Sequence, residues 1–171
     1  ATITVTQKPT EEVFTAPDNR HIDGHVAATM PLSYQGNVIE NIALDFENGR
    51  IVKATATKGQ DVLEKLLATD DGAKSLGEVS LVPDPSPIAQ GGVLFYNTLF
   101  DENASDHLAI GAAYNSNITG GKTEAPEVLA QRGWNISDVH VDFMIGSADM
   151  NIDGITQDGQ TVPVFRNGDW A

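Results

Sequence analysis

The chain has 171 residues, enough for one domain with a sizeable core, and nothing in its length requires a second domain. Ten Lys and Arg residues against 24 Asp and Glu residues give a net charge of −14, which disfavours binding to nucleic acid or to an anionic membrane surface. There is no cysteine, so disulfides and thiolate metal sites are excluded. No stretch reads as a membrane span or secretory signal, so we expect a soluble, intracellular protein.

The first third of the chain predicts short strands joined by turns. Residues 2–6 alternate as a strand, and a strand pattern interrupted by proline covers residues 24–34. Residues 38–46 and 50–57 form two further strand patterns. Asn48-Gly49 joins them, which is the strongest short-range signal for a hairpin.

Helical and buried segments follow in the middle of the chain. Leucine and valine recur at helical spacing over residues 60–68, and a short second helix can begin at residues 70–72. Residues 78–82 read as a strand, and residues 84–87 as a loop because two prolines force their predecessors out of the helical region. The apolar, aromatic run over residues 93–100 is expected to be buried.

The last part of the chain mixes loops with strands. Residues 101–107 are polar and are expected to turn beside the apolar run. The loop-rich segment that follows contains one helical piece at residues 126–131, and residues 139–145 read as a buried strand. Residues 150–156 and 161–165 form a second predicted hairpin. These elements predict an α+β domain with a mixed, largely antiparallel sheet, hairpins and two or three short helices.

The strand over residues 139–145 carries two side chains able to bind a metal ion. Side chains alternate along a strand, so His140 and Asp142 share one face while Val141 and Phe143 point the other way. An imidazole and a carboxylate among apolar residues are costly to desolvate unless each has a partner. A metal ion is one such partner, and a hydrogen-bonded His–Asp pair is the other. The spacing alone leaves both interpretations open.

Two denser patterns are less convincing. His21, Asp23 and His25 would share a face if extended, but the surrounding composition is that of an exposed turn. Asp149 to Gly154 matches the first half of an EF-hand calcium loop. Its twelfth position is Gln160 instead of a bidentate glutamate, and its flanks read as strands. A strand with a bulge explains this second pattern better.

Four other acidic and histidine residues indicate a metal site only when they are considered together. Glu12 and Glu78, taken singly, are typical of surface carboxylates. Glu102 and His107 lie in the polar turn after the apolar run, and loops often carry functional groups. Together these residues are the kind that a site for two cations requires, because several carboxylates must offset the repulsion between the ions.

Several long motifs, in order and at matching spacing, resemble those of the aminopeptidase T and aminopeptidase S (PepS) group of dimetal aminopeptidases. The motifs are Pro9-Thr-Glu-Glu-Val-Phe-Thr15, Gly77-Glu78-Val79, Leu94-Phe-Tyr-Asn-Thr-Leu-Phe-Asp-Glu-Asn-Ala-Ser105, His107, Tyr114, His140-Val-Asp-Phe-Met-Ile-Gly146, Asp153-Gly-Ile155 and Phe165-Arg-Asn-Gly168. The resemblance extends from residue 9 to residue 170 and favours the metal interpretation of His140 and Asp142.

The resemblance implies a cytoplasmic, homodimeric enzyme that removes N-terminal residues from peptides with two divalent cations, which could be Zn, Co, Mn or Mg. By motif position, the implied metal ligands are Glu12, Glu78, Glu102, His107, His140 and Asp142, with Glu78 as the expected bridge. Tyr114 is the implied oxyanion donor. Glu102 is the further ligand or general base, and Glu102 or Glu11 is expected to carry a proton to the leaving amine.

Family members are longer and have an N-terminal α/β domain before this segment. We therefore expect residues 1–171 to be a single C-terminal, metal-binding catalytic domain. Two alternatives stay open at this point. One is a non-catalytic acidic module that folds and self-associates without metal, and the other is a calcium-binding domain built on residues 149–153.

Overall fold

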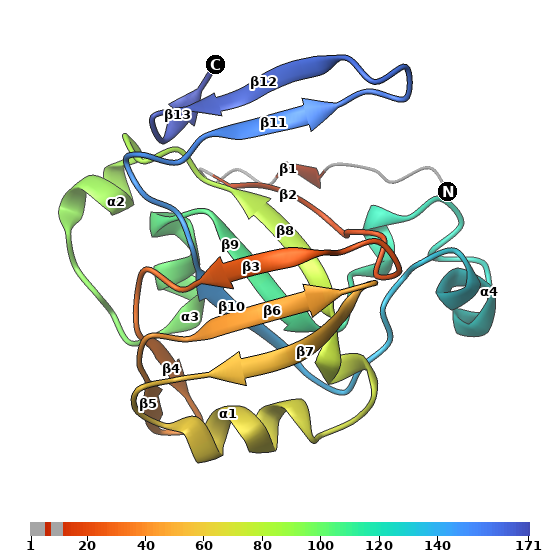
Figure 1. Ribbon diagram of the computed structural model, residues 1–171, viewed down its shortest axis with the longest axis horizontal. Helices are drawn as coiled ribbons and strands as arrows, with labels where there is room; N and C mark the ends of the chain where they lie inside the picture. Colours follow the sequence, from red (N-terminus) through yellow and green to blue (C-terminus); the bar gives the residue numbers. More distant parts are fainter. Residues whose placement is uncertain (1–5, 8–11) are drawn as a thin grey trace.

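The computed structural model describes residues 6–7 and 12–171, with side chains from residue 12 onward. Its largest sheet is antiparallel and has the strand order β1-β2-β8-β9-β10 (Figure 1). The strands of this main sheet are β1 (Thr6–Gln7), β2 (Val13–Thr15), β8 (Leu76–Leu81), β9 (His107–Gly111) and β10 (His140–Met144).

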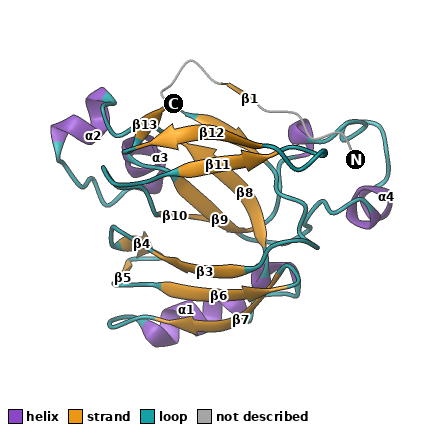
Figure 2. Ribbon diagram, turned by 45° about the horizontal axis from the view of Figure 1, so that its top comes forward, coloured by secondary structure: helices purple, strands orange, loops and turns teal. Residues whose placement is uncertain are grey.

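A second layer lies against the main sheet (Figure 2). It contains the sheet β3-β6-β7 and the two-stranded sheet β4-β5. The bounds of these strands are β3 (Gly24–Ala27), β4 (Leu32–Tyr34), β5 (Asn37–Ile39), β6 (Ala43–Glu47) and β7 (Arg50–Thr55). The strand pattern over residues 24–34 is divided into β3 and β4, as the interrupting proline predicted. The strand predicted over residues 38–46 is also divided, near Asn41, whose φ is 55°.

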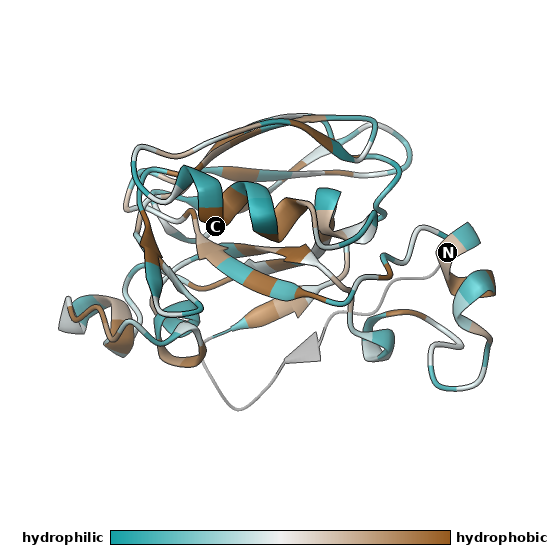
Figure 3. Cartoon of the chain, turned by 90° about the horizontal axis from the view of Figure 1, so that it is seen from below, coloured by the Kyte–Doolittle hydropathy of each residue, from teal (hydrophilic) through white to brown (hydrophobic). Residues whose placement is uncertain are grey.

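Helix α1 (Gln60–Leu67) closes the core from the side of β5 and β7. Hydrophobic and hydrophilic residues alternate along it (Figure 3), and Leu63 and Leu66 are its buried residues. They join one cluster with core residues of both layers, including Val141 and Phe143 of β10. The prediction of an amphipathic helix over residues 60–68 is thus confirmed.

Both predicted hairpins are present. β6 and β7 are joined by Asn48 and Gly49, whose φ angles of 48° and 83° are those of a type I′ turn. The C-terminal sheet consists of β11 (Ile152–Ile155), β12 (Thr161–Arg166) and β13 (Asp169–Trp170). A bulge falls between Ile152 and Asp153, as expected for a strand instead of a calcium loop.

The remaining helices are short: α2 (Pro87–Gly91), α3 (Thr98–Asp101) and α4 (Pro126–Gln131), with 3₁₀ turns η1 (Gly72–Lys74), η2 (Glu102–Ala104) and η3 (Asn115–Asn117). The helix predicted at residues 126–131 is confirmed. The α+β class is confirmed too, and the described strands pair in antiparallel fashion. The strand predicted at residues 2–6 lies outside the described residues except for Thr6. No described helix has the length and apolar character needed to cross a membrane.

The expectation that residues 93–100 are buried is wrong. Phe95 is 49% exposed, Tyr96 59% and Leu99 73%, whereas the polar Asp101 that follows is buried. The Asp101 carboxylate accepts hydrogen bonds from the backbone N–H groups of Phe95 and Asn97. Residues 93–100 belong to none of the described strands, so the Asp101 side chain turns inward to satisfy part of the segment's backbone and the apolar side chains are left outside.

A substitution at Gly77 tests how tightly the main sheet is packed. It is buried at a register shift of β8, and a Cβ there would collide with the carbonyl oxygens of Gly111 and Ala112. We expect Gly77→Ala to lower the free energy of unfolding by about 1–3 kcal/mol or more, measured by urea denaturation. Gly91→Ala is the control, because its Cβ meets nothing within 4 Å in helix α2. Equal stability of the two variants would contradict this packing.

Candidate metal centre

The strand register of the main sheet brings two carboxylates together over one small residue. Glu78 on β8 and Asp142 on β10 are both direct partners of Ala109 on the central strand β9. Directly opposite residues in antiparallel strands point to the same face. Because Ala109 is small and fully buried, it leaves the space above it to the two carboxylates.

Two histidines extend this face by the two-residue period of a strand. His140 lies two positions before Asp142 on β10, and His107 lies two positions before Ala109 on β9. The intervening Val141 and Phe143 point into the hydrophobic core on the opposite side. The predicted division of β10 into one face that carries His140 and Asp142 and another that faces the core is therefore present in the structure.

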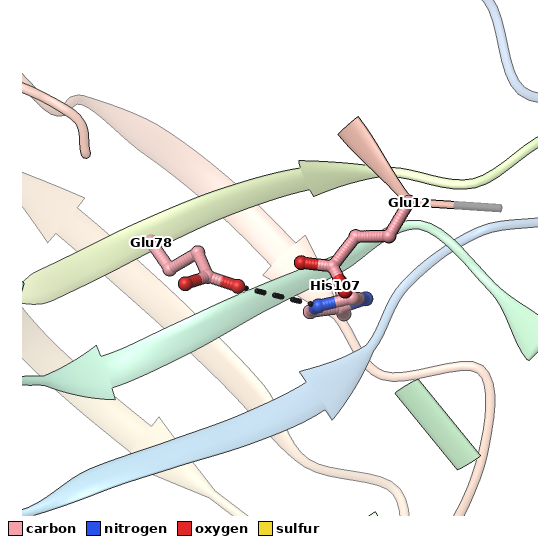
Figure 4. A group of neighbouring side chains, drawn as sticks. All are labelled: Glu12, Glu78 and His107. Carbon is pink, nitrogen blue, oxygen red and sulfur yellow. Dashed lines mark ion pairs between the residues drawn. The ribbon is translucent and has the colours of Figure 1, made fainter. Parts of the chain in front are cut away.

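Glu12 and Glu102 reach the same face from outside the three central strands. Glu12 directly precedes β2, and Glu102 begins the 3₁₀ turn η2 just before β9. Figure 4 shows the Glu12 and Glu78 side chains converging on His107. Three sets of side chains have ligand atoms within 4.8 Å of one another: Glu12, Glu78 and His107; Glu78, His140 and Asp142; and Glu102, His107 and Asp142. The structure thus brings together all six ligands expected from the sequence.

Glu78 lies at the centre of the cluster. Its Oε1 is 3.4 Å from Nε2 of His107, and its Oε2 is 3.8 Å from Nε2 of His140. Nε2 of His140 is also 3.3 Å from Oδ1 of Asp142. The two oxygens of one carboxylate therefore face two different imidazoles, which is the arrangement that a carboxylate bridging two cations needs.

Backbone carbonyl groups set the orientation of both imidazoles. Nδ1 of His107 is 3.0 Å from the carbonyl oxygen of Ser105, and Nδ1 of His140 is 2.7 Å from that of Ala112. A carbonyl oxygen only accepts hydrogen bonds, so each Nδ1 carries the hydrogen. In the neutral imidazole the lone pair is then on Nε2, on the side of the carboxylates, as in histidines that bind metal ions.

Burial and donor chemistry fit divalent cations. Glu12, Glu78, His107 and Asp142 are each at most 7% exposed, and Oδ1 of Asp142 is buried with no hydrogen-bond partner among the described residues. Buried carboxylates without a compensating charge are costly. Carboxylate and imidazole groups together suit several first-row divalent ions. The residues present therefore fit a metal ion in this position.

The carboxylates also act on the protonation of the histidines. Burial alone would lower the pKa of His140, but its interactions with Asp142, the Ala112 carbonyl group and Glu78 raise that pKa to about 9. For His107, burial is likewise outweighed by Glu78 and the Ser105 carbonyl group, so its pKa is raised. When no cation is bound, the raised pKa values favour the protonated, positively charged imidazoles, which offset the charge of the carboxylates.

Tyr114 lies over the cluster, beside a cavity. Its ring centroid is 4.7 Å from that of His140, and its ring also packs edge-on against Phe14. Burial, followed by the negative charges of Glu78 and Asp142, raises the pKa of the Tyr114 phenol. The phenol consequently keeps its proton near neutral pH and can donate a hydrogen bond.

A cavity of about 320 Å³ opens onto the cluster. Glu12, Glu78, Glu102, Tyr114, His140 and Asp142 line it together with Tyr34, Thr98, Leu99 and Val141. The sequence pattern did not indicate Tyr34, which comes from the second layer. Thr98 and Leu99 belong to the motif that ends at Ser105, but the expectation that residues 93–100 are buried did not place them at the cavity. Glu11, the second carboxylate considered for proton transfer, lies outside the described residues.

The alternative clusters are not assembled as metal sites. His25 pairs with Asp45 at 2.5 Å on the surface, and Asp23 accepts a hydrogen bond from the backbone of Asn48. Asp153 pairs with Arg166 at 2.5 Å, across the hairpin of β11 and β12. In the part of the chain that the structure describes, the groupings able to hold a metal ion all belong to the face of the main sheet.

Comparisons with known proteins agree with this chemistry. The family model for thermophilic metalloproteases (M29) matches residues 2–170. Aminopeptidase AmpS of Bacillus subtilis (strain 168) is 63% identical over 163 residues, and aminopeptidase T of Thermus aquaticus is 49% identical over 163 residues. Each match covers 95% of this chain and 40% of the relative.

A solved structure, wild-type AmpT from Thermus thermophilus, superposes with a TM-score of 0.89 at 50% identity, over 95% of this chain and 40% of that chain. The chain thus spans about two fifths of the length of the relatives it matches. With a family model that matches nearly the whole chain and a fold shared with one of its relatives, the chain belongs to the M29 family of metalloproteases.

Proposed function

We propose that this chain is the metal-binding catalytic domain of an aminopeptidase that hydrolyses the N-terminal peptide bond of peptides with two divalent cations. The observation that carries the proposal is the position of Glu78, whose two oxygens face His107 and His140 separately. The names of the relatives, which are aminopeptidases, support the reaction class.

The assignment of ligands follows from the three sets of side chains. Glu12, Glu78 and His107 would hold one cation, and Glu78, His140 and Asp142 the other, with Glu78 shared. Glu102 lies within reach of His107 and Asp142 and is only partly buried on the cavity wall. This position suits either a further ligand or a group that exchanges protons with a substrate in the cavity.

When bound, the cations would supply a water of lowered pKa as the nucleophile and would polarise the scissile carbonyl group. Two side chains of this chain supply proton transfer and hydrogen bonding. Glu102, which lines the cavity, takes a proton from the attacking water and passes it to the leaving amine. The Tyr114 phenol, held over His140 by ring packing, donates a hydrogen bond to the oxygen on which negative charge develops.

The proposal also covers the longer protein, the oligomeric state and the cellular compartment to which the domain would belong. Residues 1–171 would form a C-terminal domain that supplies the metal ligands, while the segments of the relatives beyond this match would help to position the peptide. On the basis of the family resemblance, we also propose that the protein is a homodimer located in the cytoplasm. Sedimentation analysis of the purified chain tests the dimer.

The second candidate function is a non-catalytic acidic module that folds and associates without metal. The net charge of −14 is the observation that favours it. Elemental analysis after dialysis separates the two candidates, because a module of this kind retains no zinc, cobalt or manganese. Metal retained by a chain that shows no peptidase activity would leave the metal site in place and restrict the proposal to a binding role.

Glu78→Gln tests the bridging carboxylate. The amide keeps the shape of the side chain but removes the charge that both cations would share, so we expect metal affinity to fall at least about 10- to 100-fold and bound metal to fall below two ions per chain. Calorimetry and elemental analysis measure these quantities. Glu47→Gln, an exposed position at the end of β6, is the control. Unchanged binding by the Glu78 variant would exclude the bridge.

Proton release tests the histidine ligands. Near pH 7, below the pKa of His140 of about 9, metal binding must displace the His140 proton, and the raised pKa of His107 acts in the same direction. We expect release of about one proton or more, measured by calorimetry in buffers of different ionisation enthalpy. Metal affinity should rise with pH up to about 9 and then level off. No proton release near pH 7 would argue against His140 as a ligand.

Tyr114→Phe tests the oxyanion donor. Phenylalanine keeps the packing on His140 and Phe14 but cannot donate a hydrogen bond, so we expect kcat to fall about 10²–10³-fold with metal affinity unchanged. Hydrolysis of leucine p-nitroanilide by the metal-loaded protein gives kcat. Tyr96→Phe, at an exposed tyrosine that does not line the cavity, is the matched control. A native rate in the Tyr114 variant would remove this role.

A further inference from the structure

We propose that Ser80 is a positioning residue of the metal centre, whose buried hydroxyl group donates a hydrogen bond to a ligand carboxylate of the Glu12–Glu78–His107 set. The inference rests on the proposed function, because it gives the hydroxyl group a partner only when that set holds a cation. No motif in the sequence singled out Ser80.

The strand register places Ser80 among the ligands. It lies on β8 two residues after Glu78, so both side chains point to the same face of the main sheet. Its direct partners on the neighbouring strands are Phe14 of β2 and His107 of β9. Glu12 lies two positions before Phe14, and its side chain converges on His107 (Figure 4). Ser80 therefore lies between the strands that carry or adjoin the members of this set.

The hydroxyl group of Ser80 lacks a hydrogen-bond partner among the described residues, although it is buried and water cannot replace that partner. Ser80 is 1% exposed, and its Oγ has no hydrogen-bond partner among the described residues. A buried hydroxyl group without a partner is destabilising, because it has lost its hydrogen bonds to water and gained none in the protein. Oδ1 of Asp142, on the same face, is also buried; it forms an ion pair with Nε2 of His140 at 3.3 Å but has no hydrogen-bond partner among the described residues. An unmet hydroxyl group among these candidate ligands indicates that the face is completed by something that it binds.

Other buried serines show how such hydroxyl groups are normally satisfied. Ser75 donates to the carbonyl oxygen of Gly49 at 2.6 Å. Ser105 donates to the carbonyl oxygen of Asp106 at 3.0 Å and accepts from the backbone N–H of Gly146 at 2.9 Å. The bonds between Ser75 and Gly49 and between Gly146 and Ser105 join backbone segments that are distant in the sequence. Ser80 lies within a strand whose backbone is already paired on both sides, so its hydroxyl group serves no such purpose.

Among the neighbouring side chains, the acceptor that we assign to Ser80 is a carboxylate oxygen. The Phe14 side chain has no acceptor atom, and the His107 imidazole uses Nδ1 on Ser105 and directs Nε2 toward Glu78. Glu12 and Glu78 remain, and their oxygens lie within 4.8 Å of one another and of the imidazole. A carboxylate oxygen has more than one lone pair, so it can accept a hydrogen bond while it binds a cation. Such second partners orient metal-ligating carboxylates.

Ser80→Ala and Ser75→Ala form a matched pair for the test. In the metal-free chain, Ser80→Ala should leave the melting temperature unchanged or raise it, because it removes a buried, unpaired group. The same variant should bind Zn²⁺ about 10-fold or more weakly in competition with a chelator. Ser75→Ala should show the opposite pattern, with a lower melting temperature and unchanged Zn²⁺ affinity, since its hydroxyl group is already bonded.

The visible absorption of the Co²⁺-loaded protein gives a readout independent of affinity and of activity. We expect Ser80→Ala to shift the Co²⁺ bands while Ser75→Ala leaves them as in the parent chain. The proposal is overturned if Ser80→Ala binds Zn²⁺ as the parent chain does, or if it lowers the metal-free melting temperature. If the parent chain itself binds no Zn²⁺ or Co²⁺, the proposed function fails first and the role of Ser80 fails with it. Normal binding by parent and variant alike refutes Ser80 alone.

Discussion

Repulsion among buried carboxylates is the constraint on which the structure of this domain depends. Glu12, Glu78 and Asp142 lie almost fully buried on one face of the main sheet, and Glu102 adds a fourth acid at its edge. Anions brought this close in a medium of low dielectric constant need positive charge between them. Asp142, the Ala112 carbonyl group and Glu78 raise the pKa of His140 to about 9 despite burial, so its imidazolium form supplies positive charge when no cation is bound.

The sheet provides the geometry that such a cluster needs. Alternation along β10 directs His140 and Asp142 to the cluster and Val141 to the core, so one strand contributes both to the candidate metal site and to the hydrophobic core. The central strand carries Ala109 between the two acids, which allows them to approach across it. Backbone carbonyl groups, which cannot be lost by mutation, fix both imidazoles. The positions of the ligands are thus set by rigid strands more than by loops.

In the segment of residues 93–101, which precedes β9, the polar Asp101 is buried and most apolar side chains are exposed. This arrangement affects the cavity that opens onto the cluster. Asp101 turns inward to satisfy its own loop, which leaves Leu99 exposed at the cavity rim beside Tyr34 and Tyr114. The lining of the cavity therefore combines acidic side chains with the apolar Leu99 and two tyrosine rings.

The sequence by itself determined the local features: the Asn48-Gly49 hairpin, the amphipathic helix α1, the shared face of His140 and Asp142, and, through its lack of cysteine, the restriction to oxygen and nitrogen ligands. Family resemblance supplied the names of the other candidate ligands, but periodicity could not, because Glu12 and Glu102 look like surface acids in their own segments. Only the tertiary structure decided that these residues meet, that the residues around Leu99 face outward, and that Ser80 is left without a partner. Convergence of distant segments, and the balance of buried charge that it creates, depend on strand register and packing across the whole chain, which no local pattern contains.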